Sequence, residues 1–298
     1  MKALLFFLSI TCAITNAQLA AEQLNVQNYE HFNIYYSPLD SAIAVGSLPL
    51  LSVAYDEISR DLNTAEYDTF YVIIAPNRKA FRNYVGGKLP PWVGAYASPA
   101  RKLMVLKSPR WNRDGSNFNT ELIHELVHMI LNKYVDSAEI PRWLDEGLAI
   151  FYSRDKRWQT ATALSKAAAT NSLIPLTDID RVLKFSSIRA QLAYQQSYSA
   201  VHYLLTRYDI DALCLLLDGI KAGKSLSQSF QQAIGCSFSA FEEEWEVFVK
   251  DQYKWYWISD SDNLLWMIIL ILFLLSLVII RLRNKRTIRG WEEQSDVE

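Results

Sequence analysis

Residues 119–153, NTELIHELVHMILNKYVDSAEIPRWLDEGLAIFYS, contain the pattern from which the rest of the chain can be interpreted. Apolar residues recur through the first half of this stretch with the period of an α-helix. On such a helix His124 and His128, which belong to an HExxH sequence, lie one turn apart on the same face. Their imidazoles can point at one cation, and neutral imidazole is a ligand that suits zinc.

Two glutamates accompany the histidines. Glu125 lies about 100° round the helix from His124, at roughly 3.6 residues per turn, so it is placed beside a metal rather than on it. In that position a carboxylate can take the proton of an attacking water. Glu146 comes later, among the apolar residues of a second predicted helix whose first turn is marked by Pro141.

An HExxH sequence also occurs by chance on amphipathic helices, where a histidine on an apolar face is usually a satisfied core residue. Two observations favour a metal site instead. The helix is strongly apolar, so two histidines and a glutamate would be costly there without partners. The second helix, with Glu146 on its apolar side, follows at short range.

HELVH followed by WLDEGLA resembles the gluzincin zinc metallopeptidases, and in particular the small bacterial peptidase MA-like family, which has an LPRWLDEGLA-like helix and a later QSY segment. The resemblance covers roughly residues 70–250. The M1 aminopeptidases are distantly similar, with HExxH and W-L-N-E-G-F-A. This chain has one residue fewer between the second histidine and the glutamate, and it lacks their GxMEN-type motif for a substrate amino terminus.

The resemblance implies the ligands and the chemistry of the site. In gluzincins a glutamate on the helix after the HExxH helix is the third zinc ligand, so one Zn²⁺ ion is expected between His124, His128 and Glu146. Zinc would polarise the scissile carbonyl. Glu125 is expected to take a proton from the attacking water and to pass it to the leaving amine. The implied reaction is hydrolysis of a peptide bond.

The resemblance also implies where the substrate lies. In gluzincin folds the last strand of the sheet before the zinc helix is an edge, which binds an extended peptide by strand addition. The alternative is an ordinary sheet edge. The residues of this chain at that position are Gly94, Ala95, Tyr96 and Ala97.

A tyrosine or histidine often stabilises the oxyanion of the reaction in gluzincins. The candidate here is Tyr198, in the Gln196-Ser197-Tyr198 segment that resembles the QSY of the family. Tyr194 and His202 are its neighbours on related faces of the same predicted helix. The alternative is that Tyr198 only packs.

The pattern along the chain predicts an α+β fold. Before the HExxH zinc helix we expect a small N-terminal β-sheet with helices. Its elements are strands at residues 29–36, 69–75, 92–96 and 102–107 and helices at residues 40–62 and 78–84. After residue 153 the periodicity is helical, with a division between helices at residues 191–208 and 210–221. An all-helical C-terminal subdomain is therefore expected, followed by one transmembrane helix.

The two ends of the chain predict a membrane protein. Residues 1–17 resemble a cleaved secretory signal peptide, because their apolar run is too short for the alternative, an uncleaved anchor. Residues 263–281 are apolar over a length that is just enough to span a bilayer. Basic residues follow at once and mark residues 282–298 as a cytoplasmic tail. Residues 18–260 would then form the extracytoplasmic domain of a single-pass type I protein, periplasmic in a Gram-negative bacterium.

Composition limits the partners. The net charge of −2 argues against nucleic acid as the main partner. Two cysteines remain after the predicted signal peptide, Cys214 and Cys236. An exported compartment permits a disulfide between them, and two free thiols are equally consistent with the sequence. The sequence does not indicate an oligomeric state.

The sequence therefore predicts a membrane-anchored zinc metallopeptidase that acts on an extracytoplasmic protein or peptide. The alternative from another class is a membrane-tethered zinc-binding or assembly factor with little turnover. Glu125 argues against this alternative, since a protein that only binds needs no base beside the metal. A purely structural zinc domain is a third possibility, but three protein ligands leave an open position, which suits catalysis better.

Overall fold

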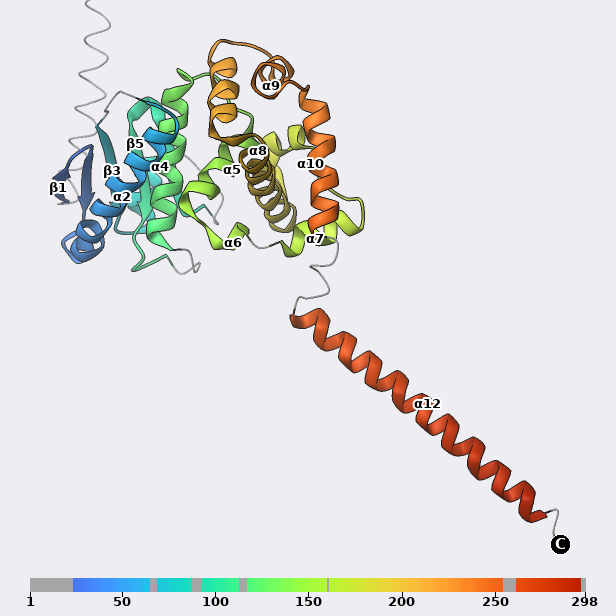
Figure 1. Ribbon diagram of the computed structural model, residues 1–298. Coiled ribbons are helices and arrows are strands. Elements are labelled where there is room, and N and C mark those ends of the chain that lie inside the picture. Colours follow the sequence, from blue (N-terminus) through green and yellow to red (C-terminus); the bar gives the residue numbers. More distant parts are fainter. Residues whose placement is uncertain are drawn as a thin grey trace, which may run out of the picture. The chain divides into compact units, whose positions relative to one another are not determined.

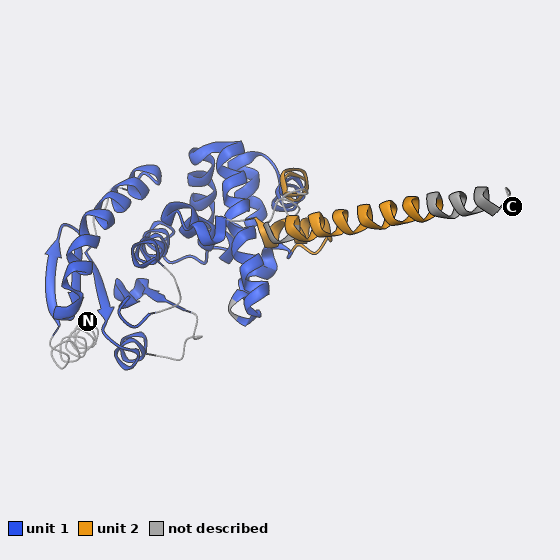
Figure 2. Cartoon of the chain, turned by 90° about the horizontal axis from the view of Figure 1, so that it is seen from below, with its two compact units in different colours: residues 1–160, 174–245 blue, residues 161–173, 246–298 orange. Residues whose placement is uncertain are grey.

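The computed structural model describes residues 24–64, 69–86, 93–112, 117–159, 161–253 and 261–295 (Figure 1). The chain divides into two compact units, residues 1–160 with 174–245 and residues 161–173 with 246–298 (Figure 2). The predicted signal peptide, residues 1–17, lies outside the described residues. The architecture is α+β, as predicted, with a mixed sheet near the N-terminus and a helical region after it.

Five strands of the described chain form one mixed sheet in the order β1-β2-β3-β5-β4 (Figure 1). They are β1 (Asn25–Tyr29), β2 (Phe32–Tyr36), β3 (Phe70–Ala75), β4 (Ala95–Ser98) and β5 (Leu103–Lys107). β2, β3 and β5 run parallel, whereas β1 and β4 are antiparallel to their neighbours. β4 therefore forms one edge of the sheet.

The single strand predicted at residues 29–36 is wrong. The chain turns at Glu30 and His31 and forms the antiparallel pair β1 and β2. Glu30 has a φ of 48°, in the left-handed region that favours glycine. Because no glycine or asparagine occupies this position, the alternating sequence continues across the turn without a visible break.

Helices cover both faces of the sheet. Alternate residues of β3 and β5, such as Ile73 and Val105, pack with Phe81 and Tyr84 of α3 (Arg78–Val85) on one face. The residues between them in sequence are also fully buried and point to the opposite face. On that face lie α2 (Ser41–Asp61) and α4 (Phe118–Tyr134), which pack against each other. The sheet therefore supports α4, the helix that carries HExxH.

A helical region completes the first unit. Its helices are α5 (Arg142–Ser153), α6 (Lys156–Gln159), α8 (Ser187–Lys221) and α9 (Leu226–Ile234), with the 3-10 segment η3 (Leu176–Lys184). α8 is interrupted at Asp209, where φ is 73° and ψ is −174°, so the division predicted between residues 208 and 210 is confirmed. The Asp209 side chain accepts hydrogen bonds from the backbone N–H groups of Asp211 and Ala212 and so caps the second half.

Trp143 anchors α5 in this helical region. The indole is fully buried, and its ring centroid lies 6.0 Å from that of Phe241 and 6.2 Å from that of Phe238. Phe230 of α9 joins the same aromatic cluster. The tryptophan of the WLDEG sequence thus holds α5 in place, and it does so three residues before Glu146.

The second unit contains α7 (Thr162–Ala169), the end of α10 (Phe238–Tyr253) and α12 (Ser261–Ser295). The hydroxyl of Ser165 donates a hydrogen bond to the carbonyl of Tyr253, at 2.5 Å. Cys214 and Cys236, both in the first unit, are free thiols, so the structure favours the second of the two alternatives left open for them.

Among the described residues, two helices are long and apolar enough to cross a membrane, Pro38–Asp61 and Leu264–Lys285. The apolar window of the first is 44% buried, as expected for a helix packed on a sheet, whereas that of the second is 0% buried. The second contains most of the predicted span, and α12 continues beyond it to Ser295. A long helix with no buried apolar side takes the place expected for the membrane anchor.

Gly147 allows α5 and α8 to pack closely. A Cβ atom at Gly147 would lie 2.4 Å from the carbonyl oxygen of Ser197 and 2.5 Å from Cγ2 of Val201. We expect Gly147→Ala to lower the free energy of unfolding by about 1–3 kcal/mol, because the backbone of α8 must move. Denaturant unfolding measures this. The control is Gly46→Ala on α2, where a Cβ meets nothing within 4 Å; equal stability of the two variants would contradict the packing.

Candidate metal centre

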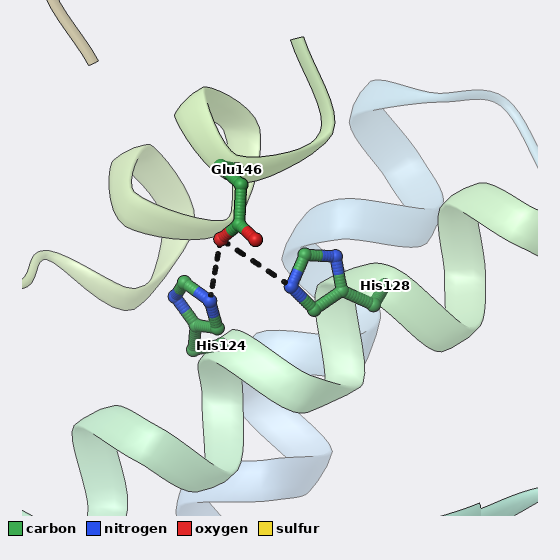
Figure 3. A group of neighbouring side chains, drawn as sticks. All are labelled: His124, His128 and Glu146. Atoms are coloured by element: carbon green, nitrogen blue, oxygen red, sulfur yellow. Dashed lines mark ion pairs between the residues drawn. The ribbon is translucent and has the colours of Figure 1, made fainter. Parts of the chain in front are cut away.

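α4 presents the HExxH motif from a capped helix. The Asn117 side chain accepts hydrogen bonds from the backbone N–H groups of Asn119 and Thr120, which the first turn leaves without partners. His124 and His128 lie on the same side of α4, with ring centroids 4.9 Å apart and an angle of 80° between the rings. Both rings point toward α5 (Figure 3).

Glu146 meets the two rings from α5. Its Oε2 atom lies 3.2 Å from Nε2 of His124 and 3.8 Å from Nε2 of His128 (Figure 3). One ligand atom from each of the three residues lies within 4.8 Å of the others. A tetrahedral zinc site with bonds of about 2.0–2.1 Å needs donor atoms about 3.3 Å apart. The group therefore offers the donor types of a zinc site, and Glu146 lies close to the required spacing from each histidine.

Arg142 holds the other oxygen of the Glu146 carboxylate. Its Nη2 atom lies 2.8 Å from Oε1, one helical turn before Glu146. Burial alone would raise the pKa of Glu146, but the hydrogen bond to His124 and the positive charges of Arg142 and His128 outweigh it and lower the pKa to about 2. Glu146 is therefore ionised at neutral pH, as a carboxylate ligand must be.

Asp145 orients His128. Nδ1 of His128 and Oδ1 of Asp145 are 2.8 Å apart. If Nδ1–H donates to this carboxylate, Nε2 is the nitrogen left to face Glu146. Burial lowers the pKa of His128, but the charge and the hydrogen bond of Asp145, with the charges of Glu146 and Glu125, raise it to about 10, so zinc must compete with a proton for Nε2. The sequence shows only that Asp145 precedes Glu146, whereas the structure shows the contact.

We expect Asp145→Asn to weaken zinc binding by about 10- to 100-fold, because the ring of His128 loses the carboxylate that orients it. Competition with a chromophoric chelator measures the affinity. The control is Asp136→Asn, which changes an exposed aspartate in the loop after α4. If both variants bind zinc as tightly as the wild type, Asp145 does not support the site.

Glu125 lies beside this group, in the wall of the same cavity. Burial raises the pKa of its carboxyl, against the opposing charges of His128 and His124. A carboxylate with a raised pKa accepts protons near neutral pH better than an exposed one does. Glu125 is thus in reach of the candidate ligands and chemically suited to carry a proton.

A cavity of about 730 Å³ brings most of the predicted site residues together. Its walls come from β4, α4, α5, α6 and α8 and the segments between them, all in the first unit. The predicted residues that line it are His124, Glu125, His128, Glu146, Gly94, Ala95, Tyr96 and Ala97. Just before β4, the carboxylate of Glu121 from α4 lies over Gly94, where a Cβ would be 2.3 Å from its oxygen.

Tyr194, rather than Tyr198, belongs to this wall. Tyr198 is not among the described residues that line the cavity, and its ring lies against that of His202. Tyr198 lies four residues after Tyr194, about 6 Å further along the helix axis, and this places it beyond the part of α8 that lines the cavity. The charge of Glu146 and burial both raise the pKa of Tyr194, so its phenol stays protonated. The helical spacing of the sequence could have pointed to Tyr194. The α8 residues in the cavity wall recur every three or four positions along one helix face, and they are Ser187, Ala190, Gln191 and Tyr194.

The Gln196-Ser197-Tyr198 segment has a structural role. The buried amide of Gln196 accepts from the N–H of Ile174 at 2.9 Å and donates to its carbonyl at 2.7 Å. The carbonyl oxygen of Ser197 packs against Gly147, where a Cβ atom would leave no room for it. The first two residues of QSY therefore fasten α8 to its neighbours.

Comparison with protein families agrees with this geometry. A family model described as Peptidase MA superfamily matches residues 90–251, more than half of the chain. The chain belongs to the Peptidase MA superfamily. The match includes every residue that lines the cavity, among them those of β4, α4 and α5. It does not single out the M1 aminopeptidases. A comparison with curated proteins gives no match.

Membership in the Peptidase MA superfamily indicates a peptidase of the zinc-dependent kind. The group of His124, His128 and Glu146 falls inside the matched residues and offers two imidazole nitrogens and one carboxylate oxygen. This is the donor set of a catalytic zinc, which keeps three protein ligands and one open position.

Proposed function

We propose that this Peptidase MA superfamily protein is a zinc-dependent metallopeptidase that hydrolyses peptide bonds of an extracytoplasmic protein or peptide. The observation that carries the proposal is the convergence of three ligand atoms within 4.8 Å of one another, beside Glu125, in a cavity that an edge strand also lines. The test is zinc-dependent cleavage of an unfolded polypeptide by the full chain.

The substrate is proposed to bind along β4. One side of β4 pairs with β5, and the order of the strands leaves its other side at the edge of the sheet. Backbone N–H and C=O groups at such an edge can hold an extended peptide by strand addition. Because residues 94–97 line the cavity, a peptide held there would lie next to Glu125 and the ligand group.

Glu125 is the proposed general base. A bound zinc would polarise the scissile carbonyl and lower the pKa of the attacking water. Glu125 takes a proton from that water and then gives it to the leaving amine. Arg142 and Asp145 keep Glu146 and His128 in place during both steps, through the contacts at 2.8 Å.

Tyr194 is the proposed oxyanion donor, in place of Tyr198. Its protonated phenol can donate a hydrogen bond to the negative charge that develops on the scissile carbonyl oxygen. The ring of Trp158 packs against that of Tyr194, with centroids 4.9 Å apart, and limits its movement. A donor that is already positioned stabilises the transition state more than the bound substrate.

We expect Tyr194→Phe to lower kcat by about 10²- to 10³-fold with little change in zinc affinity, because one donor to the oxyanion is removed. Steady-state cleavage of a fluorogenic peptide measures kcat. Tyr198→Phe is the matched control on the same helix and is expected to leave kcat near the wild-type value. The reverse result would return the role to Tyr198.

The membrane arrangement is also a proposal. Residues 1–17 would direct export, residues 18–260 would form the extracytoplasmic metallopeptidase domain, and residues 263–281 would span the membrane. The support is the 22-residue candidate span Leu264–Lys285, whose apolar window is 0% buried, and the basic residues that begin at its C-terminal end. Proteolysis of intact spheroplasts should then remove the metallopeptidase domain and spare an epitope at the C-terminus.

A further inference from the structure

Arg157 is fixed in the wall of the cavity by a buried carboxylate. Asp155, 4% exposed, lies nine residues after Glu146 and accepts hydrogen bonds from Nε of Arg157 at 3.0 Å and from Nη2 at 2.7 Å. Leaving a buried carboxylate unpaired is costly. The pair therefore stays together and holds the guanidinium in one orientation, while the Arg157 side chain remains 42% exposed.

Capping of a short helix does not explain this arrangement. Asp155 also accepts from the backbone N–H of Arg157 at 3.0 Å, which is the bond that a helix cap needs. Any residue at position 157 other than proline supplies that bond. The guanidinium adds three side-chain hydrogen bonds and a position among the residues that line the cavity.

The wall connects Arg157 with the reaction centre. The guanidinium carbon of Arg157 lies 5.7 Å from the centre of the Trp158 ring. Trp158 in turn packs on Tyr194, which lines the cavity together with Glu146 and Glu125. Arg157, Trp158 and Tyr194 all line the same cavity. A group bound at Arg157 would therefore share this cavity with the scissile bond.

The two arginines of the described cavity wall differ in what they serve. Arg142 pairs with Glu146, a candidate metal ligand. Arg157 pairs with Asp155, which is not part of the metal group. A guanidinium is planar and carries five N–H donors. Asp155 takes Nε and Nη2, so a second carboxylate would meet the edge formed by Nη1 and the other N–H of Nη2.

We propose that Arg157, positioned by Asp155, binds a carboxylate of the peptide substrate. The carboxylate is either the C-terminal one or that of an acidic side chain near the scissile bond. The inference rests on the proposed function, because it assigns a specificity-determining residue to the same cavity. It predicts a peptidase with a preference for acidic or C-terminal segments.

The test measures binding separately from cleavage. The zinc-loaded full chain in detergent carries Glu125→Gln, and dansyl-labelled peptides of one parent sequence report binding. Two pairs of peptides are compared. In the first pair one peptide ends in a carboxylate and the other in a carboxamide. In the second pair one peptide has an internal glutamate and the other has glutamine at the same position. We expect at least about tenfold tighter binding of one carboxylate form, and the pair that shows it identifies the source.

The double variant Asp155→Asn/Arg157→Gln removes both charges together, so that no buried carboxylate is left unpaired. It should lose the preference while its thermal unfolding stays cooperative. The control is Arg154→Gln, which breaks an exposed ion pair with Glu57 outside the cavity wall. Arg157→Lys should lose most of the preference, since an ammonium lacks the planar fork.

Equal binding within both peptide pairs, a preference that survives in the double variant, or no binding of any peptide would overturn the inference. The proposed function is judged by a different result, the turnover of the wild-type chain. If the wild-type chain cleaves peptides without any carboxylate preference, only the role of Arg157 is refuted and the proposed peptidase activity stands. If the chain binds carboxylates through Arg157 but never cleaves a peptide, the proposed peptidase activity is refuted and the carboxylate-binding role of Arg157 stands.

Discussion

Glu125→Gln is expected to lower kcat for peptide hydrolysis by about 10²- to 10⁴-fold and to leave zinc bound. Glutamine has nearly the shape of glutamate but cannot accept the proton of the attacking water. Glu125 is not among the grouped ligand residues, so the metal group of His124, His128 and Glu146 stays intact. Cleavage of a fluorogenic peptide gives kcat, and elemental analysis of the same sample gives the zinc content.

The matched control is Glu57→Gln, which changes a glutamate of α2 that pairs with the exposed Arg154. Its kcat should equal that of the wild type. If Glu125→Gln cleaves at the wild-type rate with zinc bound, another residue carries the proton. If it loses zinc as well as activity, Glu125 has a role in the metal site that the geometry does not suggest.

Glu146→Ala is expected to weaken zinc binding far more than Asp145→Asn, by well over the roughly 10²-fold limit expected for a residue that only orients a ligand. The variant removes one of three candidate ligands and leaves His124 and His128 alone. Activity should fall with zinc occupancy and should recover only in part when zinc is added in excess. Titration with zinc against a chelator measures the affinity.

Because Arg142 would lose its buried partner, Glu146→Ala can also destabilise the fold. Glu146→Gln fills the same space and serves as the second variant, with thermal unfolding recorded for both. A folded Glu146→Gln protein that binds zinc with wild-type affinity would remove Glu146 from the ligand set. A folded protein with weakened zinc binding supports the third ligand independently of stability.

The grouping of the candidate ligands was predictable because its members depend on local spacing. His124 and His128 are one turn apart on a single helix, and Glu146 lies on the next helix of the chain. The periodicity of the two helices and the short loop between them were therefore enough to predict that these three residues lie close together. The structure adds the contacts that spacing cannot show, such as Arg142 with Glu146 and Asp145 with His128.

Residues that come from distant segments were harder to predict. Tyr194 and Tyr198 are one turn apart on α8, and only the packing of α8 against α5 determines which of them lines the cavity. Arg157 gave no signal, because a single charged residue in a short helix usually lies in solvent. Its buried partner Asp155 becomes visible only in three dimensions.

The fold was predictable to a similar degree. Strong apolar runs gave β3, β5 and the helices, and the position of β4 at the edge of the sheet agrees with the expectation. The turn at Glu30 was missed because a residue other than glycine adopts a positive φ there. The Glu30 carboxylate accepts a hydrogen bond from the hydroxyl of Ser52, and the His31 carbonyl accepts one from the backbone N–H of Phe70. These contacts stabilise the turn against its local cost.

The most direct test of a zinc peptidase is the cleavage of an unfolded polypeptide, such as reduced and alkylated casein, by the purified full chain in detergent. We expect cleavage in the presence of zinc, its loss on addition of a chelator, and its recovery when zinc is restored. A full chain that carries one zinc ion and cleaves nothing would contradict the proposal. It would indicate instead a membrane-tethered zinc-binding factor with the fold of a peptidase.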